Sequence, residues 1–305
     1  MCGDGANDLL ALREADLSLG IQESDASYGS SFTIKKLLDS DEIIRESKNS
    51  QASIIQLLEY YTSAAFFNVL ASIIMIADST YYSSGTLMFL NFTSLLIFPV
   101  TFAFSKPAEE PTRYVPDSNF MGLHNHLIYW GNVIIPTGGI CGAYYYFHST
   151  SEFASNPNPS ITIANGFNSQ NYSATLIFLL VLVICAFNAL FLYSSAPWKQ
   201  RFYRNILFTI LFLVNTSLSI LFFFITKNLV TAFEMVEISI ANAGICLGIM
   251  MGCVVLSFLY NQLIRSFKLD HKILNTEFDE SYPIFPEESS KWCCIHIFKW
   301  LIIIL

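Results

Sequence analysis

Six apolar runs of 21 to 25 residues lie between residues 53 and 262, and they constrain the fold more than any other feature of the chain. Each run is long enough for a membrane-spanning helix, which needs about 20 mostly apolar residues. Charged residues make up only 13% of the chain, against roughly 25% in soluble domains. The sequence therefore predicts a mainly α, polytopic membrane protein with six transmembrane helices, at about 53–77, 85–105, 123–147, 173–193, 206–226 and 239–262.

Basic residues predict how these helices are threaded through the membrane. If the N-terminus is cytoplasmic, 15 of the 16 Lys and Arg residues fall on the cytoplasmic side and only Lys227 falls outside. Because cytoplasmic loops carry an excess of Lys and Arg, both termini are predicted to be cytoplasmic. The segment 263–305 is then a cytoplasmic tail, and the role of its apolar end with Cys293 and Cys294 stays open. The net charge of −8 argues against a nucleic-acid partner.

The polar start of the chain, "MCGDGAND", has the residue types of a phosphate and metal site. Gly3 and Gly5 permit a tight turn and a close backbone approach to a phosphate. Asp4 supplies a hard oxygen ligand of the kind that Mg²⁺ prefers. Asn7 can donate its amide to a phosphoryl oxygen, and a helix that begins there would point its positive end at the same place. Asp8 could cap that helix or orient a water molecule or a lysine.

The loop and the residues after it resemble a known family. "GDGANDLLALREADLSLGI" resembles the hinge GDGxNDxxALxxADxGIxx of P-type ATPases, which belong to the haloacid dehalogenase-like superfamily. Four later strings resemble those of type V pumps of subgroup B, the polyamine-transporting ATPases, in the same order along the chain. They are "ESDASYGSSFTIKK", "IIRESKNSQASI", "KPAEEPTRYVPDSNFMG" and "YSSAPWKQRFYRN". The chain thus resembles the C-terminal part of such a pump.

This resemblance implies a domain organisation and a function. Residues 1–45 would be the C-terminal edge of an α/β phosphorylation domain, and 46–262 would be a stalk helix followed by the six-helix transmembrane domain. The family moves polyamines or other cations across lysosomal or late endosomal membranes, with Mg²⁺ and ATP as cofactors and an aspartyl-phosphate intermediate. By resemblance, Asp4 would be a Mg²⁺ ligand beside Gly3 and Gly5, Asn7 would contact the phosphoryl group, and Asp8 would position the hinge.

Other parts of the family pattern do not occur in the sequence. The 305 residues contain no DKTGT string, which holds the family's nucleophile, and no nucleotide-binding domain. We therefore expect that the chain alone neither hydrolyses ATP nor pumps, and that it is a fragment of a longer pump. A non-catalytic six-helix membrane protein that regulates or scaffolds a pump is an alternative.

Polar residues inside the apolar runs are candidates for the transport path. Asn68 stands where the family has Gln, and Thr93 stands where the family has Asp, with Asn91 nearby. The string "LNFTSLL" also resembles the NxxFTSLP stretch of phospholipid-flippase pumps, so a flippase is a second alternative. We expect membrane lipid and a polyamine or other cation as partners, and no subunit can be inferred. Interhelical hydrogen bonds are expected for Asn188, Asn215 and Asn242, and contact with lipid headgroups for Glu59.

Overall fold

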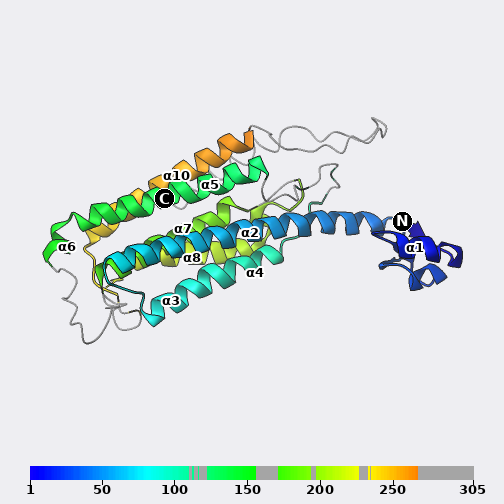
Figure 1. Ribbon diagram of the computed structural model, residues 1–305, viewed down its shortest axis with the longest axis horizontal. Coiled ribbons are helices and arrows are strands. Elements are labelled where there is room, and N and C mark those ends of the chain that lie inside the picture. The colour runs from blue at the N-terminus through cyan, green and yellow to red at the C-terminus, as the bar shows by residue number, and fades with distance from the viewer. Residues whose placement is uncertain are drawn as a thin grey trace.

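The computed structural model describes residues 1–109, 112, 116, 122–155, 171–193, 197–226, 233 and 235–266 (Figure 1). Lys227 and the part of the predicted tail beyond residue 266, with Cys293 and Cys294, lie outside the described residues. A small α/β unit stands at one end of a long helix, and this helix runs into a bundle of helices (Figure 1).

The α/β unit contains a parallel sheet of three short strands in the order β1-β2-β3. Two helical segments connect β1 to β2, and a third connects β2 to β3. The small core of the unit includes Leu12, Ala26 and Ile34, which are all buried. In chain order the elements are β1 (Cys2–Gly3), η1 (Ala6–Asp8), α1 (Leu9–Glu14), β2 (Leu19–Ile21), η2 (Asp25–Tyr28) and β3 (Phe32–Ile34).

Helix α2 (Asp39–Ala77) joins this unit to the bundle as one uninterrupted helix of 39 residues (Figure 1). It contains no Pro or Gly, so nothing in its sequence kinks it. At a rise of 1.5 Å per residue it is about 58 Å long, roughly twice the hydrocarbon thickness of a bilayer. The predicted stalk and the first predicted span are therefore two parts of the same helix.

The second predicted span is helical throughout but changes its winding. It consists of α3 (Ser84–Asn91), a π-helical segment η3 (Phe92–Ile97) and α4 (Phe98–Ala103). Pro99 has no N–H, so the carbonyl of Leu95 lacks its usual helical donor. The hydroxyl of Tyr61 on α2 donates to that carbonyl at 3.1 Å. The irregular winding is thus supported by a side chain from the neighbouring helix.

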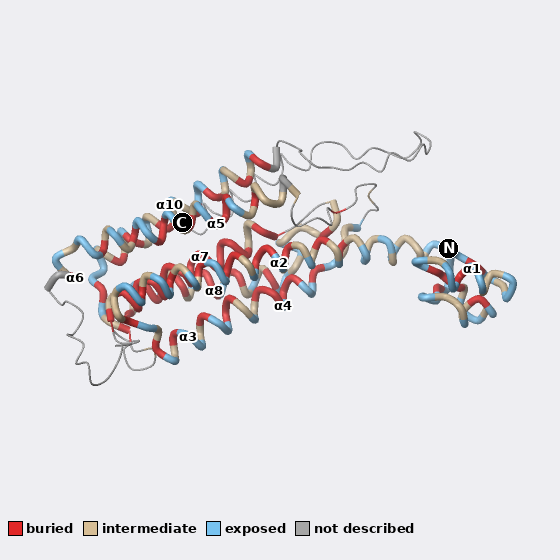
Figure 2. The backbone as a smooth tube through the Cα atoms, viewed as in Figure 1, coloured by how far each residue is buried: buried red, intermediate tan, exposed pale blue. Residues whose placement is uncertain are grey.

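Helix α7 (Tyr172–Phe191) is the centre of the bundle, and 94% of its most apolar stretch is buried (Figure 2). It packs against α2, α5 (Leu123–His148), α8 (Ile206–Phe224) and α10 (Ile240–Ser266). A helix that is apolar on all sides is expected at such a position. Two short elements complete the described part, namely α6 (Ser151–Ser155) and η4 (Phe202–Arg204).

Among the residues that the structure describes, five helices are long and apolar enough to cross a membrane, which is one fewer than the sequence predicted. Helix α5 has the predicted bounds but falls outside this group because it carries glycines, Asn132 and Pro136. Two of these residues, Gly131 and Asn132, pack on α10. The amides of Asn132 and Asn261 donate to each other's oxygens at 3.0 and 2.7 Å, and a Cβ at Gly131 would lie 1.9 Å from the ring of Tyr260. Small residues of this kind let membrane helices approach closely.

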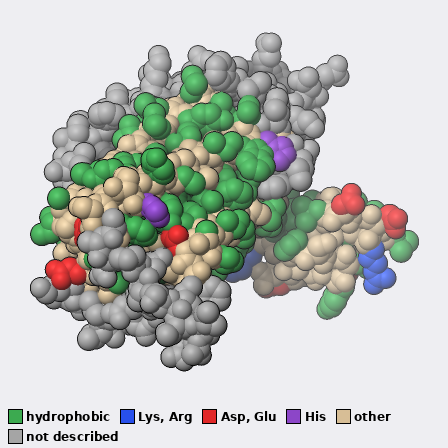
Figure 3. Space-filling view, turned by 60° about the vertical axis from the view of Figure 1, so that its left-hand side comes forward, with side chains coloured by type: hydrophobic (Ala, Val, Ile, Leu, Met, Phe, Trp, Pro, Cys, Tyr) green, Lys and Arg blue, Asp and Glu red, His purple; other side chains and the backbone are tan. Residues whose placement is uncertain are grey.

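Apolar side chains cover much of the bundle surface in this view, with a few acidic side chains among them, and the small α/β unit also carries charged side chains (Figure 3). Exposed examples on the bundle include Val69, Ile73, Met88, Ile134 and Leu256. An apolar surface of this extent is unusual for a monomer in water and is typical of contact with lipid. The chain is thus a mainly α, polytopic membrane protein with a small α/β unit at its N-terminus.

Candidate functional site

The loop with the predicted phosphate and metal residues follows β1 directly. Asp4 comes after the last residue of β1, and Asn7 and Asp8 lie in η1. Because β1 is a parallel strand, the loop stands at the carboxyl edge of the sheet, where α/β proteins bind their ligands. Asp4 and Asn7 are exposed, and Asp8 is half-buried. The structure therefore brings the predicted residues together in one accessible loop.

The two glycines of this loop provide space for side chains of the loop itself. A Cβ at Gly3 would lie 2.8 Å from the Cβ of Asp8, and a Cβ at Gly5 would lie 2.3 Å from Oδ1 of Asn7. Gly5 has φ −128° and ψ 164°, an extended conformation that any residue adopts. Gly5 therefore needs no left-handed backbone, and the lack of a Cβ is what distinguishes glycine at both positions. The close approach of the backbone to a phosphate stays a prediction.

Asp8 does not cap the following helix. It occupies the N-cap position of α1, but its backbone is already helical and its side chain makes no capping hydrogen bond. The helix itself has only six residues, so it adds little dipole to the loop. Asp8 instead lies against Gly3, and this contact fixes η1 on the end of the sheet.

Asp4 suits a metal site in which phosphate oxygens and water supply the other ligands. Within the described ranges, no three His, Cys, Asp or Glu side chains gather closely enough to hold a metal ion. Mg²⁺ is commonly bound by one or two carboxylates, with phosphate oxygens and water as its remaining ligands. One exposed carboxylate at the sheet edge fits one position of such a site.

The three predicted transport-path residues do not form one site. Asn91 is exposed, Asn68 is half-buried, and Thr93 is buried. Asn91 and Thr93 are two positions apart on a helix, so they point in nearly opposite directions. The hydroxyl of Thr93 donates to the carbonyls of Phe89 and Leu90 in its own helical run, at 2.8 and 3.2 Å.

Interhelical hydrogen bonds occur at two of the three Asn residues for which they were predicted. Asn188 on α7 donates to the hydroxyl of Ser63 on α2 at 2.5 Å. Asn242 on α10 accepts from Tyr146 at 3.3 Å and donates to Glu152. Asn215 is buried, and its Oδ1 has no hydrogen-bond partner in the described part of the chain. The prediction is thus confirmed for Asn188 and Asn242 and wrong for the oxygen of Asn215.

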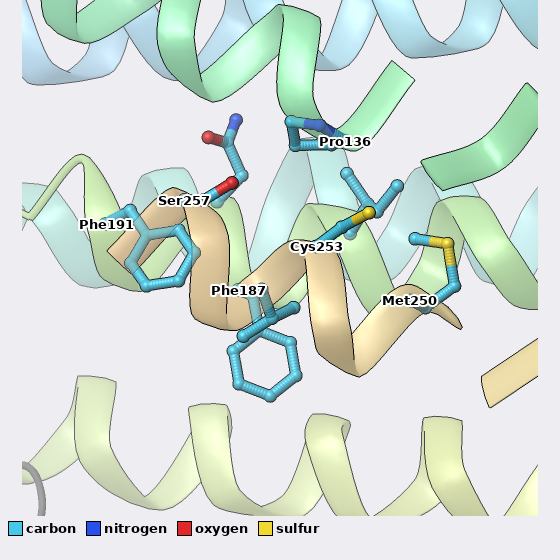
Figure 4. A pocket seen from close by; sticks show the side chains of 9 residues that line it. Pro136, Phe187, Phe191, Met250, Cys253 and Ser257 are labelled. Carbon is cyan, nitrogen blue, oxygen red and sulfur yellow. The ribbon is translucent and has the colours of Figure 1, made fainter. Parts of the chain in front are cut away.

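A small cavity lies between α5, α7 and α10 (Figure 4), and none of the predicted transport residues lines it. Its lining carries no charged side chain, which makes it a poor site for a cation. Two buried oxygens there, Oγ of Ser257 and Oδ1 of Asn188, have no hydrogen-bond partner in the described ranges. The lining includes Pro136, Phe187, Phe191, Met250, Cys253 and Ser257.

A buried lysine at the end of the membrane bundle was not predicted from the sequence. Lys199, in the connection between α7 and η4, is only 1% exposed and donates from Nζ to Oε1 of Gln56 at 2.7 Å. Burial lowers the pKa of Lys199 to about 7. Glu59 is also buried, at 7% exposed, so its predicted contact with lipid headgroups is wrong. The spacing of Gln56, Glu59 and Ser63 on one face of α2 is the signal that could have indicated a buried polar stripe.

Comparison with known proteins supports one family, although no family model matches the chain. The chain is 25% identical over 214 residues to Polyamine-transporting ATPase 13A2 of Homo sapiens, an alignment of 69% of this chain and 18% of that protein. It is 28% identical over 125 residues to Cation-transporting ATPase 5 of Schizosaccharomyces pombe, covering 40% and 11%. It is 22% identical over 209 residues to Probable cation-transporting ATPase 9 of Tetrahymena thermophila, covering 67% and 18%.

These alignments span only 11 to 18% of the length of the three relatives. They agree with the family that the hinge loop and the later strings indicated. The chain is therefore related to the cation-transporting and polyamine-transporting ATPases, the P-type ATPases of type V.

Proposed function

We propose that this chain forms the hinge, stalk and membrane part of an ATP-driven P-type pump that moves polyamines or other cations across an organellar membrane. The observation that carries this proposal is the direct connection between the α/β unit, which holds the loop at Asp4, and the helix bundle. Helix α2 begins five residues after β3 ends and continues without a break into the bundle. The names of the relatives, which include polyamine-transporting and vacuolar cation-transporting ATPases, support the same function.

In this proposal the loop residues act on a phosphorylated aspartate that another segment supplies. The exposed carboxylate of Asp4 offers an oxygen ligand to Mg²⁺, and the exposed amide of Asn7 can orient a phosphoryl oxygen. When bound, Mg²⁺ would neutralise charge on the transferring phosphoryl group. The contact of Asp8 with Gly3 holds the loop on the sheet while these groups are presented.

The stalk transmits movement because it is fastened to the membrane part through several side chains. Nδ2 of Asn49 donates to the carbonyl of Ser105, just after α4, at 2.9 Å. Arg45 donates to the carbonyls of Ala108 and Glu109 at 3.3 and 3.2 Å. A rotation of the α/β unit would therefore move α4 together with α2, as a rigid-body coupling. This movement would shift the positions of the helices that carry Asn68 and Thr93.

The orientation and the compartment belong to the proposal as well. We place both termini in the cytoplasm and the apolar bundle surface in membrane lipid. A lysosomal or late endosomal membrane follows from the family resemblance. In this arrangement the α/β unit with Asp4 faces cytosolic ATP.

A transcript analysis followed by an ATPase assay tests this function. We expect the sequence upstream of codon 1 to contain an in-frame DKTGT motif, and the encoded pump to hydrolyse ATP faster in the presence of spermine. The 305-residue chain alone should show no ATP hydrolysis. Stimulation by phospholipid without any response to spermine would support the flippase instead. A stop codon upstream in every transcript would support the non-catalytic membrane protein.

A further inference from the structure

Two polar residues inside the bundle line the cavity between α5, α7 and α10. Asn188 on α7 is 2% exposed, and Ser257 on α10 is 0% exposed (Figure 4). Oδ1 of Asn188 and Oγ of Ser257 have no hydrogen-bond partner among the described residues. Buried polar atoms are costly without a partner, and ordered water is a common one. At least two hydrogen bonds are therefore left to be made beside this cavity.

The hydrogen bonds around Asn188 determine which end of its amide is left over. The hydroxyl of Ser63 donates its one hydrogen to the carbonyl of Tyr60 at 2.8 Å, so towards Asn188 it can only accept. Nδ2 of Asn188 is the donor of that bond, at 2.5 Å. Oδ1 is thus the free end of the amide, and a ligand in the cavity must donate a hydrogen to it.

Ser257 uses its hydroxyl differently from Ser53 and Ser219. A serine inside a helix can donate to the carbonyl four positions before it. Ser53 does so to Asn49 and Ser219 does so to Asn215, both at 2.7 Å. Ser257 makes no such bond within the part of the chain that the structure describes. Its hydroxyl can therefore donate to a ligand in the cavity.

The size and chemistry of the cavity select a water molecule as this ligand. The cavity volume is about 10 Å³, which is at the lower limit for one water molecule and too small for an organic molecule. None of the nine lining residues is charged, and Mg²⁺ needs six oxygen ligands rather than two. A water molecule needs only two to four polar partners, and it donates and accepts at the same time.

Pro136 on α5 is a further reason for water at this position. Its side chain lines the cavity, and its missing N–H leaves the carbonyl of Asn132 without the usual helical donor. In membrane helices, ordered water is one of the groups that satisfy such a carbonyl. Each of the three helices around the cavity thus contributes a polar group that water can serve.

We propose that one water molecule is bound in this cavity, where it donates to Oδ1 of Asn188 and accepts the hydroxyl hydrogen of Ser257. The water joins the central helix α7 to α10. Because Asn188 also donates to Ser63, the chain of hydrogen bonds extends to α2. The inference does not depend on whether the protein is a pump, because it rests on contacts within the chain.

Hydroxyl-radical footprinting tests this proposal, because X-ray pulses convert a bound water into a radical that oxidises the side chains around it. Met250 lines the cavity and is 0% exposed, so radicals from bulk water do not reach it. We expect Met250 to be oxidised in the full chain in lipid nanodiscs. Met75 is buried on α2 and is not part of the lining, so its oxidation is the internal reference.

A double variant removes both polar partners of the water. Asn188→Leu with Ser257→Ala should lower the oxidation of Met250 relative to Met75 by at least about five-fold, because two lost hydrogen bonds weaken binding by more than that. If Met250 in the wild type is oxidised no more than Met75, no water is bound beside it. That result would overturn the proposal, and so would equal oxidation of Met250 in the wild type and the double variant.

A second comparison applies if the double variant does not fold. Ser257→Ala and Ser219→Ala each remove one buried serine hydroxyl, but that of Ser219 bonds within its own helix. Ser257→Ala should lower the oxidation of Met250 by about two-fold, because the water keeps its bond to Asn188, and Ser219→Ala should leave it unchanged. Equal oxidation of Met250 in these two variants would show that Ser257 does not hold a water molecule, and the proposal would fail.

Discussion

The loop at Asp4 and the buried site at Lys199 present their polar groups in opposite ways. Asp4 and Asn7 are exposed and lie only three positions apart in the sequence. Lys199 is buried, and its partner Gln56 is 143 positions away in the chain. The loop is arranged to meet a ligand that comes from outside, and the bundle site is completed within the chain. A motif search finds the first kind of site, and only the fold reveals the second.

We expect the largest effect at the buried site, where Lys199 should make the free energy of unfolding depend on pH. The folded pKa of about 7 lies below the ordinary value near 10.4, so the unfolded chain binds more protons between these pH values. The free energy of unfolding should therefore rise with pH in this window, by up to about 4 kcal/mol. The difference in unfolding free energy between the wild type and Lys199→Met, measured from pH 7 to pH 10, isolates this contribution. A difference that does not change with pH would contradict it.

The next effect concerns the buried amide pair of Asn132 and Asn261. Asn132→Leu leaves the amide of Asn261 without a partner inside the bundle and should destabilise the chain by about 2–3 kcal/mol. The double variant with Asn261→Leu removes both polar groups and should recover much of this loss. Equilibrium unfolding in mixed detergent micelles measures both variants. A double variant that is as unstable as the sum of the two single ones would show that the pair is not coupled.

Substitution of Gly3 and of Gly5 by Ala should have different effects on the stability of the α/β unit. A Cβ at Gly3 meets the Cβ of Asp8, which cannot rotate away, so Gly3→Ala should cost the α/β unit about 1–3 kcal/mol. A Cβ at Gly5 meets only the end of the exposed Asn7 side chain, which can move, so Gly5→Ala should change stability by less than about 0.5 kcal/mol. Hydrogen exchange of the amides in β2 compares the two variants. Equal loss of protection would contradict the packing of Asp8 on Gly3.

The smallest effect tests the support of the π-helical segment. Tyr61→Phe removes the hydroxyl that donates to the carbonyl of Leu95 and should cost about 1 kcal/mol. Tyr145→Phe, at a 77% exposed tyrosine on α5, is the control for loss of a hydroxyl and should have less effect. The change should be confined to residues near η3 in hydrogen exchange. An unchanged exchange rate in that segment would show that Pro99 alone determines the winding.

The elements that the sequence predicts well are those with a local signal. The apolar runs predict the spans in α2, α3 to α4, α7, α8 and α10, because each must cover its backbone with apolar side chains. The loop at Asp4 is predicted by its residue types. The π-helical winding at 92–97, the pairing of α5 with α10 and the burial of Lys199 depend on neighbours far away in the chain, such as Tyr61, Asn261 and Gln56. No local pattern contains that information.

The turnover of the phosphorylated enzyme tests the central claim most directly. The measurement compares the Mg²⁺-dependent decay of the phosphoenzyme in the pump that contains this chain with the decay in its Asp4→Asn variant. We predict that Asp4→Asn slows this turnover by more than about 100-fold, whereas Glu14→Gln, at an exposed position outside the loop, leaves it unchanged. Turnover of Asp4→Asn at the wild-type rate, with the same Mg²⁺ dependence, would contradict the assignment of Asp4 and with it the function proposed for the hinge.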